Sequence, residues 1–220
     1  MTSEPLVRWD WIAEHWDLVG QRFLEHLQLT AIAIVLGLLI AFPLAVVSFR
    51  NRKAYGAIAT VTGILYTIPS LALFAIVGAY TGYLSKTTAE IGLVGYTLLI
   101  LIRNIVAGLR GVPEDAREAA RGMGYSDSQM LWRVELPLAL PVIIAGIRLA
   151  TVTTIGLVTV TAVLGLGGFG AFILDGLRTF FTTETLLGAV LSVLLAIAAD
   201  ALLLLLQRLL TPWHRESRAA

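Results

Sequence analysis

The sequence predicts an all-α integral membrane protein with five transmembrane helices, and three observations support this fold class. Apolar residues make up 57% of the 220 residues and charged residues only 14%, whereas a soluble domain carries about 25% charged residues. The mean hydropathy is +0.83. Apolar runs with few charges recur along the chain, and about 20 such residues cross a bilayer core.

Five segments are predicted to span the membrane. They are residues 27–49, 57–77, 88–107, a helix within 141–164, and 186–206. Pro43 and Pro69 lie inside the first two, where neighbouring helices can satisfy the freed carbonyl groups. Arg103, Arg148 and Asp200 place charges inside the last three.

Lysine and arginine residues predict the orientation, because cytoplasmic loops are enriched in them. Eleven of the 16 fall on the side that follows spans one, three and five, and four fall on the other side. The N-terminus is therefore expected outside and the C-terminus inside, with residues 213–220 as a cytoplasmic tail. The first residues lack the pattern of a cleaved signal peptide, so none is expected.

The first 26 residues are expected to form an extracytoplasmic amphipathic segment. Apolar residues recur there on one helical face: Trp9, Ile12, Trp16, Val19 and Phe23. Two interpretations remain open. The helix lies on the outer membrane interface with its tryptophans at headgroup depth, or it packs on the bundle and caps it from outside.

The loop of residues 113–136, between spans three and four, is predicted to be a cytoplasmic helix-turn-helix. Pro113 suits a first helical position, and a helix to about Arg121 follows. Gly122 and Gly124 are expected to break this helix.

A second short helix is predicted to start at Ser126, because Ser126 and Gln129 have capping-box spacing. It is expected to end near Leu136, before Pro137. In the first helix, Ala119 and Ala120 are expected to offer a low-relief surface that another protein can approach closely.

Seven residues in this loop and directly after it form a spaced set: Glu118, Ala119, Ala120, Gly124, Val134, Leu136 and Pro137. The set resembles the "EAA" signature of binding-protein-dependent ABC importer permeases. The family has isoleucine where this chain has Val134, and the other positions match in type and spacing. The resemblance implies a permease domain like those of type I ABC importers over residues 27–212. It also implies that the loop is a coupling loop, which docks on a cytoplasmic ATPase.

A wider resemblance narrows the family to permeases for osmoprotectants such as glycine betaine, choline and carnitine. It rests on residues 68–70, 103–104, 118–124, 134–148 and 165–170. It implies a second permease chain, identical or related, two ATPase subunits and an extracytoplasmic solute-binding protein, in a prokaryotic inner membrane with its lipid. The chain has no G-x-x-x-x-G-K-[ST] loop, so ATP and Mg are expected on the partner ATPase.

Two alternatives remain: a permease for another small solute, such as an amino acid-like one, or a secondary transporter that works without ATP. Intramembrane charges are common in secondary transporters, but no convincing internal repeat is present and the loop signature would be unexplained. A structural membrane subunit is a third, less informative interpretation.

Other chemistries lack support. Cysteine is absent, and the net charge of +1 comes without a basic cluster containing aromatic residues, so no nucleic-acid partner is expected. His15, His26 and His214 are far apart and outside the predicted spans. We therefore expect no enzyme active site, no metal and no cofactor in this chain. No aromatic cage for a quaternary ammonium group is evident within the spans.

Gly165, Gly167 and Gly170 match G-x-G-x-x-G, a spacing found in dinucleotide-binding proteins. That fingerprint requires a soluble strand before it, whereas here a membrane span precedes it. We interpret residues Gly165, Gly167, Gly168 and Gly170 as a tight turn at the outer mouth.

Arg148 and Asp200 are predicted to pair within the membrane. Counted from the cytoplasmic ends of their spans, they lie at similar depths, about 14 Å and about 12 Å at 1.5 Å per residue. Charges inside a membrane usually face the bundle and find partners. In the alternative, Arg148 extends to the cytoplasmic interface and Asp200 bonds to a nearby hydroxyl or backbone group.

Overall fold

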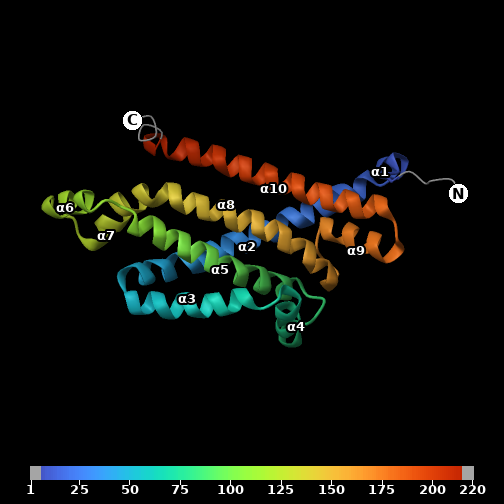
Figure 1. Ribbon diagram of the computed structural model, residues 1–220, viewed down its shortest axis with the longest axis horizontal. Helices are drawn as coiled ribbons and strands as arrows, with labels where there is room; N and C mark the ends of the chain where they lie inside the picture. The colour runs from blue at the N-terminus through green and yellow to red at the C-terminus, as the bar shows by residue number, and fades with distance from the viewer. Residues whose placement is uncertain (1–5, 215–220) are drawn as a thin grey trace.

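The computed structural model describes residues 6–214, and within that range the chain is helical with no β-strand (Figure 1). The α-helices are α1 (Trp9–Glu14), α2 (Trp16–Arg50), α3 (Arg52–Thr67), α4 (Ser70–Thr81), α5 (Lys86–Arg110), α6 (Glu114–Gly122), α7 (Asp127–Met130), α8 (Leu136–Val160), α9 (Phe169–Thr179) and α10 (Thr182–Leu210). A π-helical segment, Leu131–Glu135, joins α7 to α8, and 3₁₀ turns follow α8 and α10.

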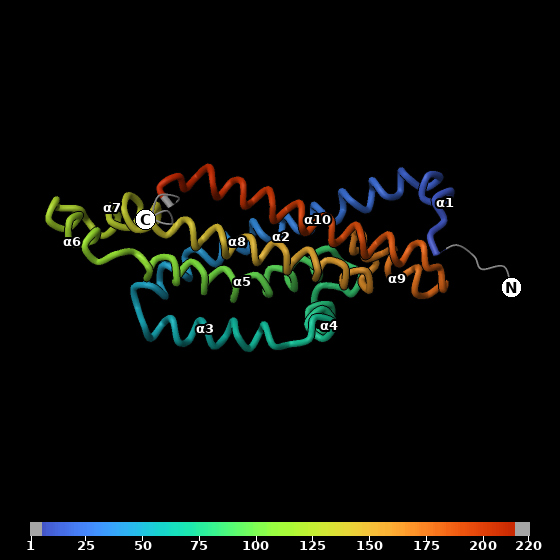
Figure 2. The backbone as a smooth tube through the Cα atoms, turned by 45° about the horizontal axis from the view of Figure 1, so that its top comes forward, coloured from blue at the N-terminus to red at the C-terminus, as the bar shows by residue number. Residues whose placement is uncertain are grey.

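The long helices run roughly along one axis, and the two described ends of the chain lie at opposite ends of the bundle (Figure 2). Within the described residues, four helices are long and apolar enough to cross a membrane: α2, α5, the helix that contains α8, and α10. The bent pair α3–α4 gives a fifth span if it counts as one. The all-helical prediction with five spans agrees with this arrangement.

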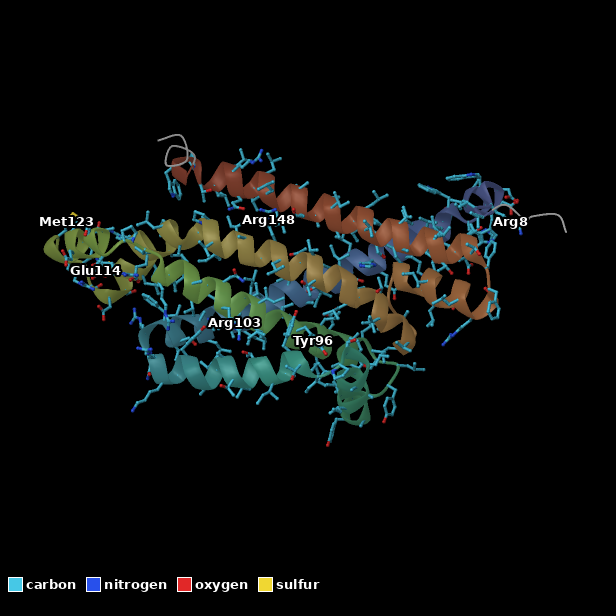
Figure 3. The ribbon with its side chains drawn as sticks, in the orientation of Figure 1. Arg8, Tyr96, Arg103, Glu114, Met123 and Arg148 are labelled. Carbon is cyan, nitrogen blue, oxygen red and sulfur yellow. The ribbon has the colours of Figure 1, made fainter. Side chains whose placement is uncertain are left out.

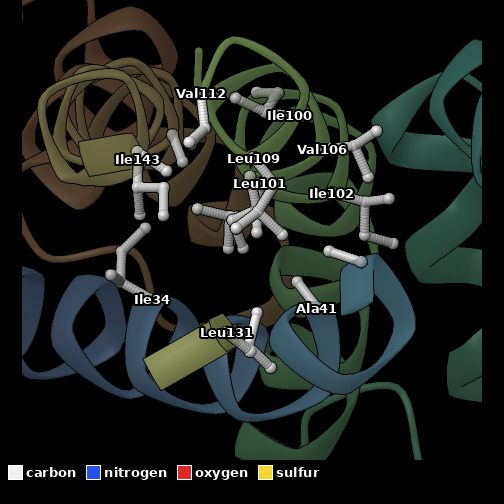
Figure 4. Close-up of a cluster of buried hydrophobic side chains, with 14 residues drawn as sticks. Ile34, Ala41, Ile100, Leu101, Ile102, Val106, Leu109, Val112, Leu131 and Ile143 are labelled. Carbon is white, nitrogen blue, oxygen red and sulfur yellow. The ribbon is translucent and has the colours of Figure 1, made fainter. Parts of the chain in front are cut away.

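Helix α5 is the centre of the bundle, packed between α2 and α8. Its apolar side chains Leu101, Ile102, Ile105 and Leu109 are almost fully buried and meet α2 and α8 in one core (Figure 4). Small residues permit this packing: a Cβ on Gly37 of α2 would lie 2.1 Å from the hydroxyl of Thr97 on α5. Close approach at small residues is how helices associate where lipid removes the hydrophobic driving force.

The second predicted span is not one helix. Helix α3 ends at Thr67 and α4 starts at Ser70, with a bend of 100° between them. Pro69 cannot donate a helical hydrogen bond and biases Ile68 toward extended backbone, which Ile68 adopts at φ −66° and ψ 128°. The hydroxyl of Tyr96 on α5 donates to the Ile68 carbonyl freed by the break. The expectation that Pro69 would lie within a continuous span was therefore wrong.

The N-terminal segment is also divided, at His15, and residues from Trp16 onward continue into the first span as α2. Val19 packs with Phe172 of α9, whereas Trp9 and Trp16 are 75% and 68% exposed. The five apolar residues thus do not share one buried face. Trp11, between them, packs edge-on against Phe172, which attaches α1 to the bundle as the capping interpretation requires.

The second loop helix does not end before Pro137. Residues Asp127–Leu164 form one continuous helical stretch in which the π-helical segment precedes α8. The Leu136 N–H bonds to the Leu131 carbonyl, five residues earlier. Proline lacks a donor and crowds the carbonyl four residues before it. The wider π turn relieves that crowding, so Pro137 enters the helix near its start instead of stopping it.

Candidate functional site

The loop of residues 113–136 forms one end of the molecule, with Met123 and Glu114 at the tip and Arg8 at the far end (Figure 3). Helix α6 starts at Glu114, with Pro113 as its N-cap, one residue later than the sequence suggested. Gly124 has φ +79°, the left-handed backbone that favours glycine, so it turns the chain from α6 toward α7. The capping box is present as predicted: Ser126 and Gln129 each accept from the other's backbone N–H.

The signature residues divide between the surface and the interior of this loop. Glu118 and Ala119 are exposed, and Met123, which the sequence analysis did not single out, is 67% exposed. Ala120 is only 1% exposed, so it packs inward and does not contribute to the expected low-relief surface. Leu136 packs against the main core, which anchors the loop to α8.

Arg117 holds the loop together, a role that the sequence analysis did not predict. Its guanidinium donates to the carboxylate of Glu135 at 2.9 Å, to Glu114 at 3.0 Å and to the Leu109 carbonyl at 2.7 Å. One side chain thus ties α6 to the π segment and to the end of α5. Hydrogen bonds from Arg121 and then Arg117 hold the pKa of Glu114 below its ordinary value. Arg117 and Glu135 are 18 residues apart, and no short-range pattern links them.

Replacing Arg117 with glutamine is expected to loosen this loop without unfolding the bundle. Glu135 has an exposed side-chain fraction of only 8%, and removing one partner of a buried ion pair costs about 3–5 kcal/mol. Amide hydrogen exchange in α6 should accelerate, while exchange in α5 stays unchanged. The matched control is Arg121→Gln, whose side chain is 60% exposed and should leave α6 exchange nearly unaltered. Equal exchange in both variants would contradict this role of Arg117.

Arg148 of α8 and Asp200 of α10 form a two-point ion pair. The guanidinium Nε and Nη2 atoms each lie 2.8 Å from a carboxylate oxygen of Asp200. Gln207 extends the network: its side chain accepts from Arg148 at 3.3 Å and donates to the Pro141 carbonyl at 3.0 Å. Gln207 was missed, although its seven-residue spacing from Asp200 puts both on one helical face. The pair joins α8 to α10, so the predicted contact between the two side chains is present. Its depth in the membrane and its functional role stay predictions.

The glycine turn follows α8 and packs against α2. Gly165, Gly167 and Gly168 have φ values of +75°, +106° and +50°. A Cβ on Gly168 would lie 2.5 Å from that of His26. Gly170 has ordinary helical backbone, but a Cβ there would lie 2.1 Å from the Thr159 carbonyl oxygen. These glycines permit close backbone approach, as expected of a tight turn. The segment before them is α8 and a 3₁₀ turn, not the strand that a dinucleotide-binding fingerprint requires.

His26 was expected outside the spans, but it lies within α2 and is fully buried. The Phe169 N–H donates to Nδ1 at 3.3 Å, and Nε2 lies 3.1 Å from the Ile155 carbonyl. Since the carbonyl can only accept, Nε2 carries the proton and the ring is neutral in this arrangement. His26 therefore fixes the glycine turn and the start of α9 onto α2 and α8.

The fold and the loop define a class of protein, a multi-pass subunit with the architecture of ABC importer membrane domains. The structure described as inward-facing conformations of the MetNI methionine ABC transporter matches with a TM-score of 0.80 at 21% identity, covering 90% of this chain and 98% of that one. A crystal structure of an amino acid ABC transporter with histidines matches with a TM-score of 0.71 at 17% identity, covering 92% and 98%. At these identities the likeness shows the fold alone.

The chain belongs to the family of binding-protein-dependent transport system inner membrane components, whose model matches residues 33–216. It is 39% identical over 188 residues to the choline transport system permease protein OpuBB of Bacillus subtilis, covering 86% of each chain. It is also 39% identical over 195 residues to the osmoprotectant import permease protein OsmW of Salmonella typhimurium, covering 86% of this chain and 89% of that one. The protein is thus a multi-pass permease of the inner membrane.

Proposed function

We propose that this chain forms, with a second permease chain, the pathway by which an ATP-driven importer carries a quaternary ammonium osmoprotectant such as glycine betaine, choline or carnitine. The observation that carries this proposal is the 39% identity to a choline permease over 86% of both chains. Relatives named for carnitine and for several osmoprotectants share 34–37% identity. In this proposal the N-terminus faces outward and the C-terminus faces the cytoplasm.

The partner ATPase, which binds ATP and Mg, docks on the loop of residues 113–136. The geometry supports this part of the proposal. Glu118, Ala119 and Met123 are exposed at one end of the bundle, and Arg117 braces the helix that carries them. A rigid loop can transmit a displacement of the ATPase to α5 and α8, whereas a mobile one would absorb it. A solute-binding protein delivers the solute to the opposite end, near α1, α4 and α9.

The rival solute is an amino acid, as in the methionine transporter that shares the fold. Its identity to this chain is only 21%, so the osmoprotectant relatives weigh more. A secondary transporter would need no binding protein or ATPase, and the family membership argues against it.

In proteoliposomes containing the assembled complex, glycine betaine, choline or carnitine is expected to stimulate ATP hydrolysis and to be taken up, but only with the binding protein present. The dependence on the binding protein is expected because no aromatic cage is evident within the predicted spans of this chain, which leaves high-affinity selection to that partner. The measurement is competition among the three labelled solutes, with methionine as the control that lacks a quaternary ammonium group. Uptake of methionine alone, or tight solute binding by the isolated permease, would contradict the proposal.

A further inference from the structure

Glu90 of α5 is a carboxylate without a partner. Both of its oxygens are buried, and neither accepts a hydrogen bond within the described residues. The other buried side-chain atoms without partners in that range are hydroxyl oxygens of Thr30 and Ser48, which are uncharged. A chain that keeps a buried carboxylate unpaired is less stable than one with an apolar or amide side chain there, so a ligand is the simplest reason to keep it.

Glu90 lines a cavity of about 660 Å³ between α2, α3, α4 and α5, and its carboxylate lies behind the cavity wall. The walls are almost entirely apolar, formed by Leu36, Ile40, Leu65, Leu73, Val77 and Ile91 among others. Within residues 6–214, Glu90 is the only acidic residue that lines it. Lys86, one turn earlier on α5, also lines the cavity but forms no ion pair with Glu90 among the described contacts. The volume is in the range of small-molecule sites.

The composition of the cavity selects the class of ligand. A small inorganic cation takes six or more oxygen ligands, and the lining offers one carboxylate and the Thr87 hydroxyl. A quaternary ammonium group has a large apolar surface of methyl groups and one delocalised positive charge. Apolar walls bury the methyl groups, and one carboxylate balances the charge.

The cavity also lies where a transported solute would enter. Glu90 is four residues into α5, about 6 Å from the helix start, at the end of the bundle opposite α6 and α7. Helix α4 lies across this region because of the break at Pro69 (Figure 1). We propose that the Glu90 cavity is a weak binding subsite for the quaternary ammonium group of the solute, in the outer half of the pathway. Naming the solute rests on the proposed function, whereas the ligand chemistry rests on the cavity.

The direct test uses the permease–ATPase complex in nanodiscs of phosphatidylglycerol and phosphatidylethanolamine, which contain no choline headgroup. Saturation-transfer NMR would measure binding of tetramethylammonium, of choline, and of 3,3-dimethylbutan-1-ol, the uncharged carbon analogue of choline. The wild type is expected to prefer choline to its analogue by about tenfold. Glu90→Gln, which keeps the shape and removes the charge, should abolish this preference. Glu14→Gln, a matched change at an exposed carboxylate, should keep it.

Thermal unfolding of the same complexes separates this role from a structural one. Glu90→Gln is expected to leave the melting temperature unchanged or to raise it, because an unpaired buried charge is removed. A lower melting temperature would show that Lys86 or a cation of a second chain pairs with Glu90, and would overturn the proposal. Equal ammonium binding by wild type and Glu90→Gln would overturn it as well.

Nanodiscs of phosphatidylcholine distinguish the solute from a lipid headgroup. Unchanged tetramethylammonium binding there is expected, and its loss would assign the cavity to lipid and overturn the solute subsite. The proposed function fails separately: a wild-type complex that takes up none of the three solutes would refute it. The binding comparison between wild type and Glu90→Gln needs no transport, so its outcome is independent of that failure.

Discussion

Asp200→Asn is expected to reduce the amount of correctly assembled transporter, and solute uptake with it, by roughly 100-fold. The change leaves Arg148 without its anion inside a span, and an unpaired arginine at a helix centre costs about 2.5–3.5 kcal/mol. Because the pair joins α8 to α10, its loss should separate two helices that we propose move together with the coupling loop. Size-exclusion profiles and uptake in proteoliposomes measure the two effects.

The exchange Arg148→Asp with Asp200→Arg is expected to recover part of the loss. Recovery is partial because the exchanged arginine no longer meets Gln207, which lies 3.3 Å from Arg148 in the native arrangement. Asp175→Asn, a matched change at an exposed aspartate of α9, should leave assembly and uptake unchanged. Full uptake by Asp200→Asn would refute a functional role for the pair.

Glu118→Lys and Gly124→Leu are expected to abolish solute uptake while the protein still inserts and folds. Glu118 is exposed and makes no described ion pair, so reversing its charge should act on the docked ATPase and not on the permease itself. Leucine at Gly124 must adopt φ +79°, which costs about 1–2 kcal/mol and redirects α6. Uptake and ATP hydrolysis stimulated by the solute-loaded binding protein should be measured in the same vesicles.

Two controls match these changes at the other end of the bundle. Glu14→Lys reverses an exposed charge on α1. Gly20→Leu adds a side chain to α2 at a position where an added Cβ would meet no neighbouring atom within 4 Å. Both controls should keep uptake coupled to hydrolysis. If Glu118→Lys and Gly124→Leu also transport at the wild-type rate with unchanged stimulated hydrolysis, the loop does not couple the two subunits.

Local rules were sufficient for several features of the chain. The capping box at Ser126 and Gln129 depends on one turn of backbone, and it is present as expected. The left-handed backbone at Gly124 and in the glycine turn also follows from residue type. The depths of Arg148 and Asp200 could be counted along their helices, and the two side chains are in contact.

Local rules failed where a proline or a charge found a distant partner. Both Pro43 and Pro69 were expected to lie inside helices. This is confirmed for Pro43, which lies within α2, and wrong for Pro69, where the chain bends by 100°. The difference depends in part on Tyr96, whose hydroxyl satisfies the Ile68 carbonyl from another helix. Pro137 was expected to end a helix, but a π turn accommodates it.

By itself, the sequence determined that this chain is a membrane protein with five spans and a helical loop at one end, because hydropathy, glycine placement and capping act within a few residues of each other. Only the tertiary structure decided which groups meet: His26 under the glycine turn, Arg117 with Glu135, and Gln207 beside the ion pair. The physical reason is that each of these contacts joins helices whose relative rotation and separation are set by packing of small residues across the whole bundle, which no local pattern specifies.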